Sequence, residues 1–177
     1  MAADQRTANL LGALAVVLGD RIEAAVREVG GLSARDAAAL ITLRNYAERE
    51  PLGVLERALG LSQPGAVRLA DRLAERGLVQ RRRDGPDRRE VRLSLTSEGR
   101  TAADAALRER AGALEALLDR LGHAGRRAIE PVLEELLAAA TASRADARTT
   151  CRLCDAVACG HPARCPVTRA ADAAATI

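Results

Sequence analysis

Apolar residues recur at helical spacing over most of the chain, and glycine, proline and capping residues divide that pattern into segments. The first apolar stretch predicts one helix over residues 5–29, which a pair of glycines ends. Ser33, followed by Asp36, has the pattern of a capping box and predicts a second helix that runs to about residue 48. The first part of the chain is therefore expected to be helical.

Two short helices separated by a tight turn are expected next. Residues 54–60 predict a short helix that ends at a glycine, and a second helix is expected over residues 63–76. Ser62 is placed to cap this second helix, and Pro64 lies in its first turn, where the missing N–H costs little. A helix, a tight turn and a helix form the pattern of a helix-turn-helix.

A β-hairpin is expected directly after the helix pair. Residues 79–83 can form a strand, residues 84–87 are a turn signal, and residues 90–95 return with alternating apolar and polar positions. Two further helices are expected over residues 97–121 and 124–142. The predicted fold class is therefore mainly α, a winged helix-turn-helix with a small β-hairpin wing and a helical dimerisation region.

Composition agrees with a helical fold. The chain has 177 residues, of which 48% are hydrophobic and 1% aromatic, and Ala and Leu dominate the hydrophobic set. This usage favours helices over a large β-sandwich or barrel. The segment 62–94 contains nine Arg and five acidic residues, a net charge of +4, whereas the remaining 18 Arg and 19 acidic residues give −1. Such a basic segment is a candidate footprint for a polyanion.

The second helix of the pair can be divided into a buried and an exposed face. Four residues recur at i, i+3, i+4 and i+7 and are expected to face the core: Ala66, Leu69, Ala70 and Leu73. In a helix-turn-helix the start of this helix enters the DNA major groove. There Gln63 can read adenine, Arg68 can read guanine, and Val67 can touch a thymine methyl group. Arg72 is expected at a phosphate, and an ordinary solvated helix face is the alternative interpretation.

The hairpin carries a basic tip. Arg81, Arg82 and Arg83 precede the turn, and Arg88 and Arg89 follow it. Two strands can carry these guanidinium groups into the adjacent minor groove, whose negative potential attracts Arg. An aspartate in the tip can hold one of them in place through hydrogen bonds. A basic turn that is merely well solvated is the alternative.

Together these segments resemble the winged helix-turn-helix of MarR-family transcriptional regulators. The resemblance rests on LSQPGAVRLADRLAERGLVQRR and on DGPDRREVRLSLTSEG, whose Asp and Arg in the tip, strand and Leu-Thr-x-x-Gly are similar to the family's wing signature. It covers about residues 5–142 and implies an obligate homodimer on a pseudo-palindromic operator. It commonly implies repression that a small phenolic ligand or an oxidant relieves.

The resemblance also assigns individual residues. Gln63, Pro64, Gly65, Val67 and Arg68 match the family's groove-facing positions, and Asp87 and Arg89 match its wing pair. Gly65 departs from the family pattern, in which a side chain is more usual. The DNA-binding residues predicted from both arguments are Ser62, Gln63, Pro64, Gly65, Val67, Arg68, Arg72, Arg83, Asp87, Arg88 and Arg89.

The chain is expected to divide into four segments. Residues 1–32 form a dimerisation helix, residues 33–99 the DNA-binding domain, residues 100–147 further dimerisation helices, and residues 148–177 a Cys-rich tail. The terminal helices are apolar on more than one face, and a domain of this size cannot bury both within one subunit. From residue 138 onward an Ala-rich stretch either continues the last helix or frays.

All four cysteines lie in the tail with the spacing C-x2-C-x4-C-x5-C: Cys151, Cys154, Cys159 and Cys165. Four thiolates within this distance can surround one tetrahedral ion, which predicts structural zinc, and His161 can substitute for any one of them. Three alternatives stay open: a redox switch in which thiols form disulfides, an iron–sulfur cluster, or four thiols with no common role. The family resemblance does not decide between them.

The sequence therefore predicts a cytoplasmic, homodimeric repressor that binds double-stranded operator DNA, responds to a small-molecule effector and has no catalytic activity. It contains no run of 18 apolar residues and no P-loop, dinucleotide fingerprint or Ser-His-Asp grouping. Tyr46, the only aromatic residue, is expected in the core, with a ligand contact as the alternative because it lies near the effector pocket that the resemblance implies. Two other functions remain open: a regulator in which the Cys cluster senses redox state or metal, and a helical interaction module without DNA binding.

Overall fold

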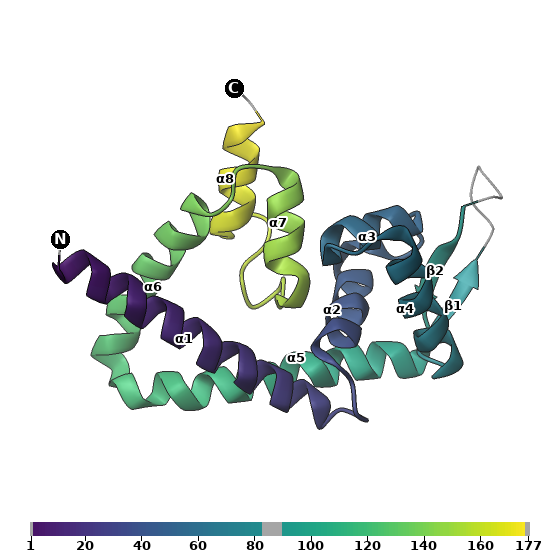
Figure 1. The fold of residues 1–177 in the computed structure, drawn as a ribbon, viewed down its shortest axis with the longest axis horizontal. Coiled ribbons are helices and arrows are strands. Elements are labelled where there is room, and N and C mark those ends of the chain that lie inside the picture. Colours follow the sequence, from purple (N-terminus) through teal and green to yellow (C-terminus); the bar gives the residue numbers. More distant parts are fainter. Residues whose placement is uncertain (1, 83–89, 176–177) are drawn as a thin grey trace.

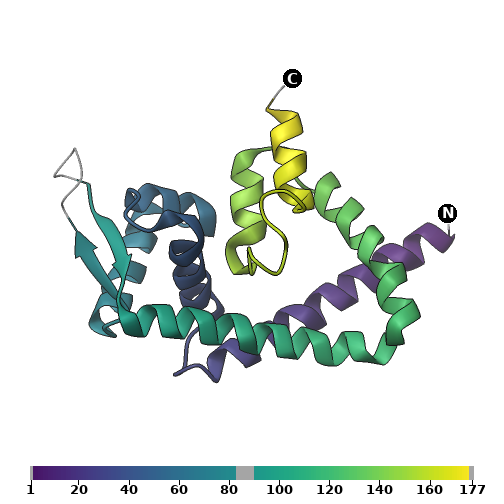
Figure 2. The same cartoon turned by 180° about the vertical axis from the view of Figure 1, so that it is seen from behind.

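The computed structural model describes residues 2–82 and 90–175, and Figures 1 and 2 show it from opposite sides. Among these residues no helix is both long and apolar enough to cross a membrane. In chain order the elements are α1 (Ala2–Arg27), α2 (Ala34–Thr42), a π-helical turn (Leu43–Ala47), α3 (Leu52–Leu59), α4 (Gln63–Glu75), β1 (Val79–Arg82), β2 (Arg92–Leu95), α5 (Ser97–Leu118), a 3₁₀ turn (Asp119–Leu121), α6 (Gly122–Ala139), α7 (Arg144–Thr150), a 3₁₀ turn (Cys151–Leu153) and α8 (Pro166–Ala174).

The winged helix-turn-helix lies at one end of the molecule, where α2, α3, α4 and the two strands gather over the start of α5 (Figure 1). The four positions predicted to form the buried face of α4 are confirmed, because each is at most 1% exposed: Ala66, Leu69, Ala70 and Leu73. Three of them, Leu69, Ala70 and Leu73, join one continuous core with buried leucines of α2, α3 and β2. Burial of this apolar surface holds the module together.

Local signals set the ends of these helices as the sequence predicted. The capping box at α2 is confirmed, since the Asp36 N–H donates to Ser33 Oγ at 3.1 Å and the Ser33 N–H donates to Asp36 Oδ2 at 3.2 Å. Gly60 ends α3 with a left-handed φ of 60°. Ser62 occupies the N-cap position of α4, but its side chain makes no capping hydrogen bond. Its position is thus as predicted, without the hydrogen bond that usually comes with it.

The junction between the wing and α5 explains the Leu-Thr-x-x-Gly motif. Thr96 caps α5, because its Oγ1 accepts a hydrogen bond from the Gly99 N–H at 2.9 Å. A Cβ atom at Gly99 would lie 1.9 Å from the carbonyl oxygen of Leu78, so only glycine lets α5 pack this closely against the start of the wing. The strands pair antiparallel, with Val79 opposite Leu95.

A long helical arm extends from the winged-helix end. α1 packs along α5, and the chain then turns at Gly122, with φ of 61°, into α6 (Figure 2). No residue of α6 is buried, although all of its residues are described. Large apolar side chains that are 39–64% exposed line both helices: Leu10, Leu11, Leu14, Val16 and Val17 on α1, and Val132, Leu133, Leu136 and Leu137 on α6.

The tail folds back between the arm and the winged-helix end. The Ala-rich stretch neither continues α6 nor frays as predicted: α6 ends at Ala139, and Ser143 begins the new helix α7 by accepting the Asp146 N–H at 3.1 Å. α7 and α8 pack against each other, α8 also contacts α6, and α7 contacts α3. Figure 1 shows the tail spanning the space between α6 and α2.

Candidate nucleic-acid interface and thiol cluster

The start of α4 offers an open surface. Gln63 and Arg68 are exposed, whereas Gly65 and Val67 are partly buried. Arg68 forms no ion pair with any residue that the structure describes, so its guanidinium is free to meet an external anion. Ser62 and Pro64, which complete the predicted groove-facing set, are exposed beside them. This face combines hydrogen-bonding, apolar and cationic groups within two helical turns, which is what base reading in a major groove requires.

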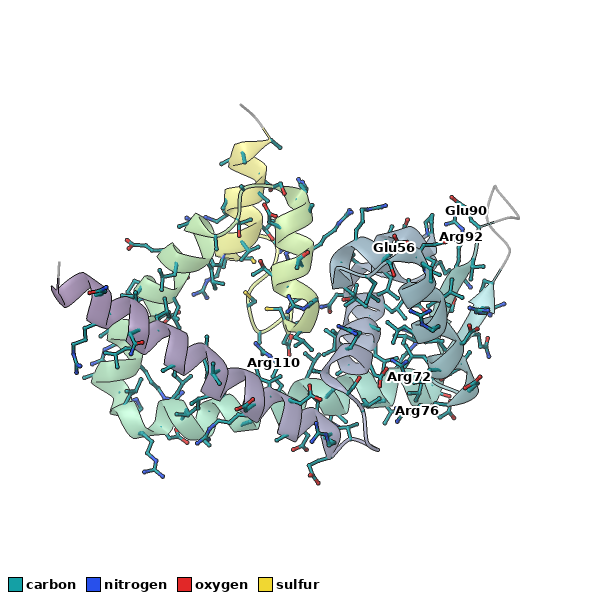
Figure 3. All side chains as sticks on the ribbon, in the orientation of Figure 1. Glu56, Arg72, Arg76, Glu90, Arg92 and Arg110 are labelled. Carbon is teal, nitrogen blue, oxygen red and sulfur yellow. The ribbon has the colours of Figure 1, made fainter. Side chains whose placement is uncertain are left out.

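Arg72 has a partner inside the molecule. Its Nε and Nη2 donate to Asp36 Oδ1 at 3.1 and 2.7 Å, and Arg76 Nη1 lies 3.8 Å from Asp36 Oδ2 (Figure 3). Burial raises the pKa of Asp36, but hydrogen bonds from Arg72 and Ser33 outweigh it and hold the pKa of this carboxyl below its usual value. The other N–H groups of Arg72 remain available for a phosphate, so the predicted phosphate contact stays a prediction. The ion pair with Asp36 is a structural role that the sequence analysis missed.

The wing is braced by arginines as well. Arg81 Nη2 lies 2.9 Å from Asp71 Oδ1 and connects β1 to α4. Arg92 Nη1 donates to the Arg49 carbonyl oxygen at 2.7 Å, and its Nη2 donates to Glu90 Oε2 at 2.8 Å. Figure 3 shows Arg92 and Glu90 together at the outer end of the described strands. The basic segment is thus divided: some of its arginines are internal ties, whereas Arg68 faces outward without an ion pair.

The tip of the wing carries the remaining predicted contacts. These four residues lie outside the described part of the chain: Arg83, Asp87, Arg88 and Arg89. Their place in the minor groove stays a prediction. The described strands nevertheless carry the chain outward from the body of the module on the same side as α4 (Figure 1).

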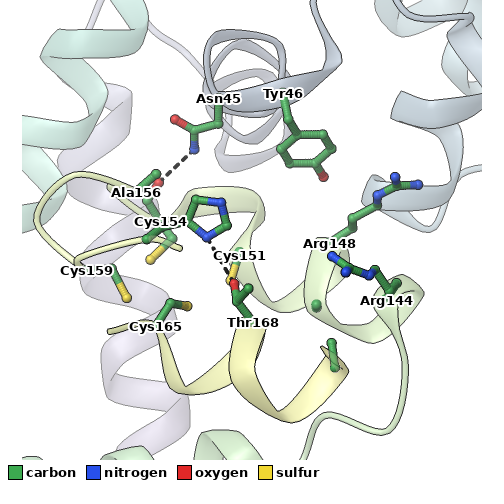
Figure 4. A pocket seen from close by; sticks show the side chains of 13 residues that line it. Asn45, Tyr46, Arg144, Arg148, Cys151, Cys154, Ala156, Cys159, Cys165 and Thr168 are labelled. Carbon is green, nitrogen blue, oxygen red and sulfur yellow. Dashed lines mark hydrogen bonds between the residues drawn. The ribbon is translucent and has the colours of Figure 1, made fainter. Parts of the chain in front are cut away.

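A second feature is a cavity of about 230 Å³ between the tail and the winged-helix domain, which all four cysteines and His161 line (Figure 4). Asn45 and Tyr46 form its other wall. The expectation that Tyr46 lies in the core is wrong, because its side chain is 36% exposed. The π-helical turn keeps Leu43 and Ala47 buried, while Asn45 and Tyr46 between them line the cavity. Such turns occur frequently at functional sites.

Hydrogen bonds fix the tail to the winged-helix domain at this cavity. Asn45 Nδ2 donates to the Cys154 carbonyl oxygen at 3.0 Å, and Thr42 Oγ1 donates to the Arg152 carbonyl oxygen at 3.5 Å. Arg148 stacks over the Tyr46 ring at 5.8 Å from its centroid, a cation–π geometry. The tail is therefore attached to the domain that carries α4.

All four cysteines are free thiols that influence one another. The hydrogen bond between Cys151 and Cys154 lowers the pKa of Cys151 and raises the pKa of Cys154. Burial raises the pKa of Cys159 to about 12. Burial also raises the pKa of Cys165, but the hydroxyl and N–H of Thr168 outweigh it, so the pKa of Cys165 is lowered. Within the described residues, no three His, Cys, Asp or Glu side chains are gathered as a metal site.

Comparisons with known proteins agree with the geometry of the DNA-binding module. The profile of the MarR family matches residues 31–90. The repressor CouR, solved with a 23-mer DNA duplex, is 26% identical over 72% of this chain and 89% of CouR, with a TM-score of 0.60. CouR from Rhodococcus jostii RHA1, solved with p-coumaroyl-CoA, is 26% identical over 72% of this chain and 88% of that chain, with a TM-score of 0.57.

A more distant structure shares the fold. MepR, a regulator of the Staphylococcus aureus multidrug efflux pump MepA, is 14% identical over 75% of this chain and 96% of its own, with a TM-score of 0.65. The matched residues 31–90 run from the turn before α2 to just before β2. Residues 31–90, which include the capped α2 and the α3–α4 pair, match the MarR family of winged-helix regulators, and 72–75% of the chain shares the fold of these solved structures.

Proposed function

We propose that the protein is a homodimeric, non-catalytic transcription regulator that represses by binding operator DNA. The observation that carries this proposal is the open start of α4, with Arg68 exposed and without an ion pair, in a module that the MarR family profile matches. The DNA complex of CouR supports it by similarity. The complex of CouR with p-coumaroyl-CoA likewise supports a small-molecule effector for this chain.

In this proposal base reading and phosphate binding fall to different residues. Gln63 and Arg68 read base edges, and Val67 contacts a thymine methyl group. Arg72 and the wing arginines meet phosphates or the minor groove, which gives affinity that falls with salt. Specificity then depends on the few groove-facing side chains, and affinity depends on the sum of the cationic groups.

The test compares Arg68→Ala with Arg120→Ala, which changes an exposed arginine in the 3₁₀ turn after α5. A binding site is first selected from random duplexes, and affinity is then measured by fluorescence anisotropy on that site and on a scrambled duplex. Loss of one bidentate base contact should weaken site binding by about 5- to 150-fold and relax one operator position. Arg120→Ala should bind like the parent chain.

Two outcomes would contradict this assignment. Equal losses for Arg68→Ala on selected and scrambled DNA would make Arg68 a phosphate contact. Binding that does not change with salt, or selection that yields no sequence, would favour the alternative of a helical interaction module without DNA binding.

The homodimer is supported by the apolar faces of α1 and α6. Leu14 is 40% exposed and Leu133 is 43% exposed, and each lies within a row of similar side chains. Exposed apolar rows of this kind mark association surfaces. Leu14→Glu and Leu133→Glu should each shift the sedimentation mass from two chains toward one. A parent chain that sediments as a monomer at micromolar concentration would refute the dimer.

A further inference from the structure

We propose that the four cysteines of the tail form one tetrathiolate site for a zinc ion, and that this site fastens the tail to the DNA-binding domain. The site lies outside the residues matched by the family profile. It neither requires DNA binding nor takes part in it. The occupant is identified by the donor set alone, because four closely spaced thiolates are ligands that zinc prefers.

The four thiols, referred to as the thiol ring, line one cavity (Figure 4). Two separate disulfides would need only pairs, whereas four sulfurs around a single ion need every ligand to adjoin several others.

The ring must contract for an ion to be held. No three donors in the described chain are yet gathered as metal ligands, so binding has to draw the sulfurs together. The backbone allows this, since Cys151 opens a 3₁₀ turn and Gly160 adopts a left-handed φ of 70° between Cys159 and Cys165. Cys165 stands at the N-cap of α8, where the helix dipole favours a thiolate.

The charge around the ring suits an anionic complex. When zinc enters, the thiol protons pass to solvent and four thiolates leave the site doubly negative. Arg110 on α5 acts electrostatically on Cys154, and its Nε is buried without a hydrogen-bond partner among the described residues (Figure 3). Arg144 and Arg148 line the same cavity. An unpaired buried donor beside the thiols is what a thiolate complex would satisfy.

The position of the ring gives the ion a mechanical role. The carbonyl oxygen of Cys154 accepts the Asn45 amide, and Cys165 begins α8, which packs on α6. A metal that joins these two cysteines would connect the winged-helix domain to the helical arm. The tail buries few side chains of its own, so metal ligation supplies cohesion that burial does not.

The experiment uses the full chain, reduced and stripped with a chelator that is then removed. Titration with Zn²⁺ alone, followed by elemental analysis, should give one zinc per chain. Replacement by Co²⁺ should give the visible bands and thiolate charge-transfer absorption of a tetrahedral sulfur site. Hydrogen exchange in the tail should slow when metal is added.

Four variants decide the ligand set. Cys154→Ser and Cys159→Ser should each reduce tight zinc binding at least about tenfold, while their far-ultraviolet circular dichroism stays that of the parent. Val157→Ser, which changes an 81% exposed side chain in the same loop, should bind zinc like the parent. His161→Ala should also retain zinc, because four thiolates complete the site without it.

The contrary outcomes are equally definite. A reduced chain that binds no zinc, or cysteine variants that keep it, would overturn the proposal. A brown protein that contains iron and sulfide would replace zinc by an iron–sulfur cluster, and metal-free chains with two disulfides would make the ring a redox pair. DNA affinity measured on the same samples separates this proposal from the regulatory one, because either can fail alone.

Discussion

The DNA-binding module and the tail begin a helix with the same local device, yet they are held in different ways. Ser33 and Asp36 form a capping box at α2, and Ser143 caps α7 by accepting the N–H of Asp146, which stands at the same spacing of three residues. Asp36 is buried and bound by an arginine of α4, whereas the second pair remains at the surface of the tail. A cap therefore fixes where a helix begins but not what stabilises it.

Burial makes the difference between the two regions. The module shares one core of leucines, alanines and valines that are at most 9% exposed. From residue 140 onward, the buried side chains of the described tail are only these: Thr141, Cys165, Val167 and Ala171. A region with so little buried apolar surface needs other stabilising interactions. The tail has hydrogen bonds to the winged-helix domain and four thiols that can bind a metal ion.

The largest expected effect comes from one buried side chain in each region. Leu69→Ala should lower the free energy of unfolding by about 2–5 kcal/mol, because it opens a cavity in the module core. Val167→Ala, in the tail, should cost about 1–2 kcal/mol from the methyl groups lost. Urea denaturation at a fixed protein concentration measures both. Equal losses would mean that the tail is as tightly packed as the module.

Two glycines on α5 allow the effect of close packing on stability to be measured separately from the effect of helix propensity. Gly99→Ala should cost about 1–3 kcal/mol, because its Cβ would overlap the Leu78 carbonyl oxygen. Gly112 lies on the same helix, and a Cβ there would have no atom within 4 Å. Gly112→Ala should therefore raise the free energy of unfolding by about 0.5–1 kcal/mol. Thermal denaturation of both variants should give shifts of opposite sign, and shifts of the same sign would contradict the packing argument.

The ion pair of Asp36 makes the stability of the module depend on pH. Because the pKa of Asp36 is lowered in the folded chain, its contribution to stability is present above the usual aspartate pKa and is lost as pH falls through the folded value. Arg72→Ala should lower the free energy of unfolding by about 1–2 kcal/mol at neutral pH. The variant should also lose less stability on acidification, because without Arg72 burial raises the pKa of Asp36.

Arg68→Ala, one turn earlier on α4, is the control for this change. Arg68 makes no ion pair among the described residues, so its removal should alter stability by less than about 0.5 kcal/mol at any pH. Urea titrations between neutral pH and pH values near the aspartate pKa would compare the two. If the free energy of unfolding falls equally with pH in the parent and in Arg72→Ala, the Asp36–Arg72 ion pair does not cause the pH dependence.

The smallest expected effect separates the two regions most directly. Asn45→Ala removes the hydrogen bond to the Cys154 carbonyl oxygen and should cost about 1 kcal/mol of tail attachment. Hydrogen exchange should then quicken in residues 148–165, while α4 keeps its protection. Gln80→Ala, at an exposed amide on β1, should change neither region. Faster exchange throughout the chain would mean that tail and module open together.

Much of the fold was predictable because its signals are local. The helical period assigned α1, α3, α4 and α5, alternation assigned the hairpin, and Ser33 with Asp36 set the start of α2. The π-helical turn and the exposed Tyr46 were missed, since one extra residue in a turn leaves no mark in a periodic pattern. The start of α7 was also missed, although Ser143 followed by Asp146 was a signal that could have found it.

The sequence by itself determined the module, the buried face of α4 and the exposure of Arg68, because spacing along a helix decides which side chains share a face. It also set four thiols close along the chain. Only the tertiary structure decided the ion pairs of Asp36 with Arg72 and of Asp71 with Arg81. It also decided the hydrogen bond from Asn45 to the Cys154 carbonyl oxygen. These partners are far apart in sequence, and only packing of the core brings them within hydrogen-bond or ion-pair distance.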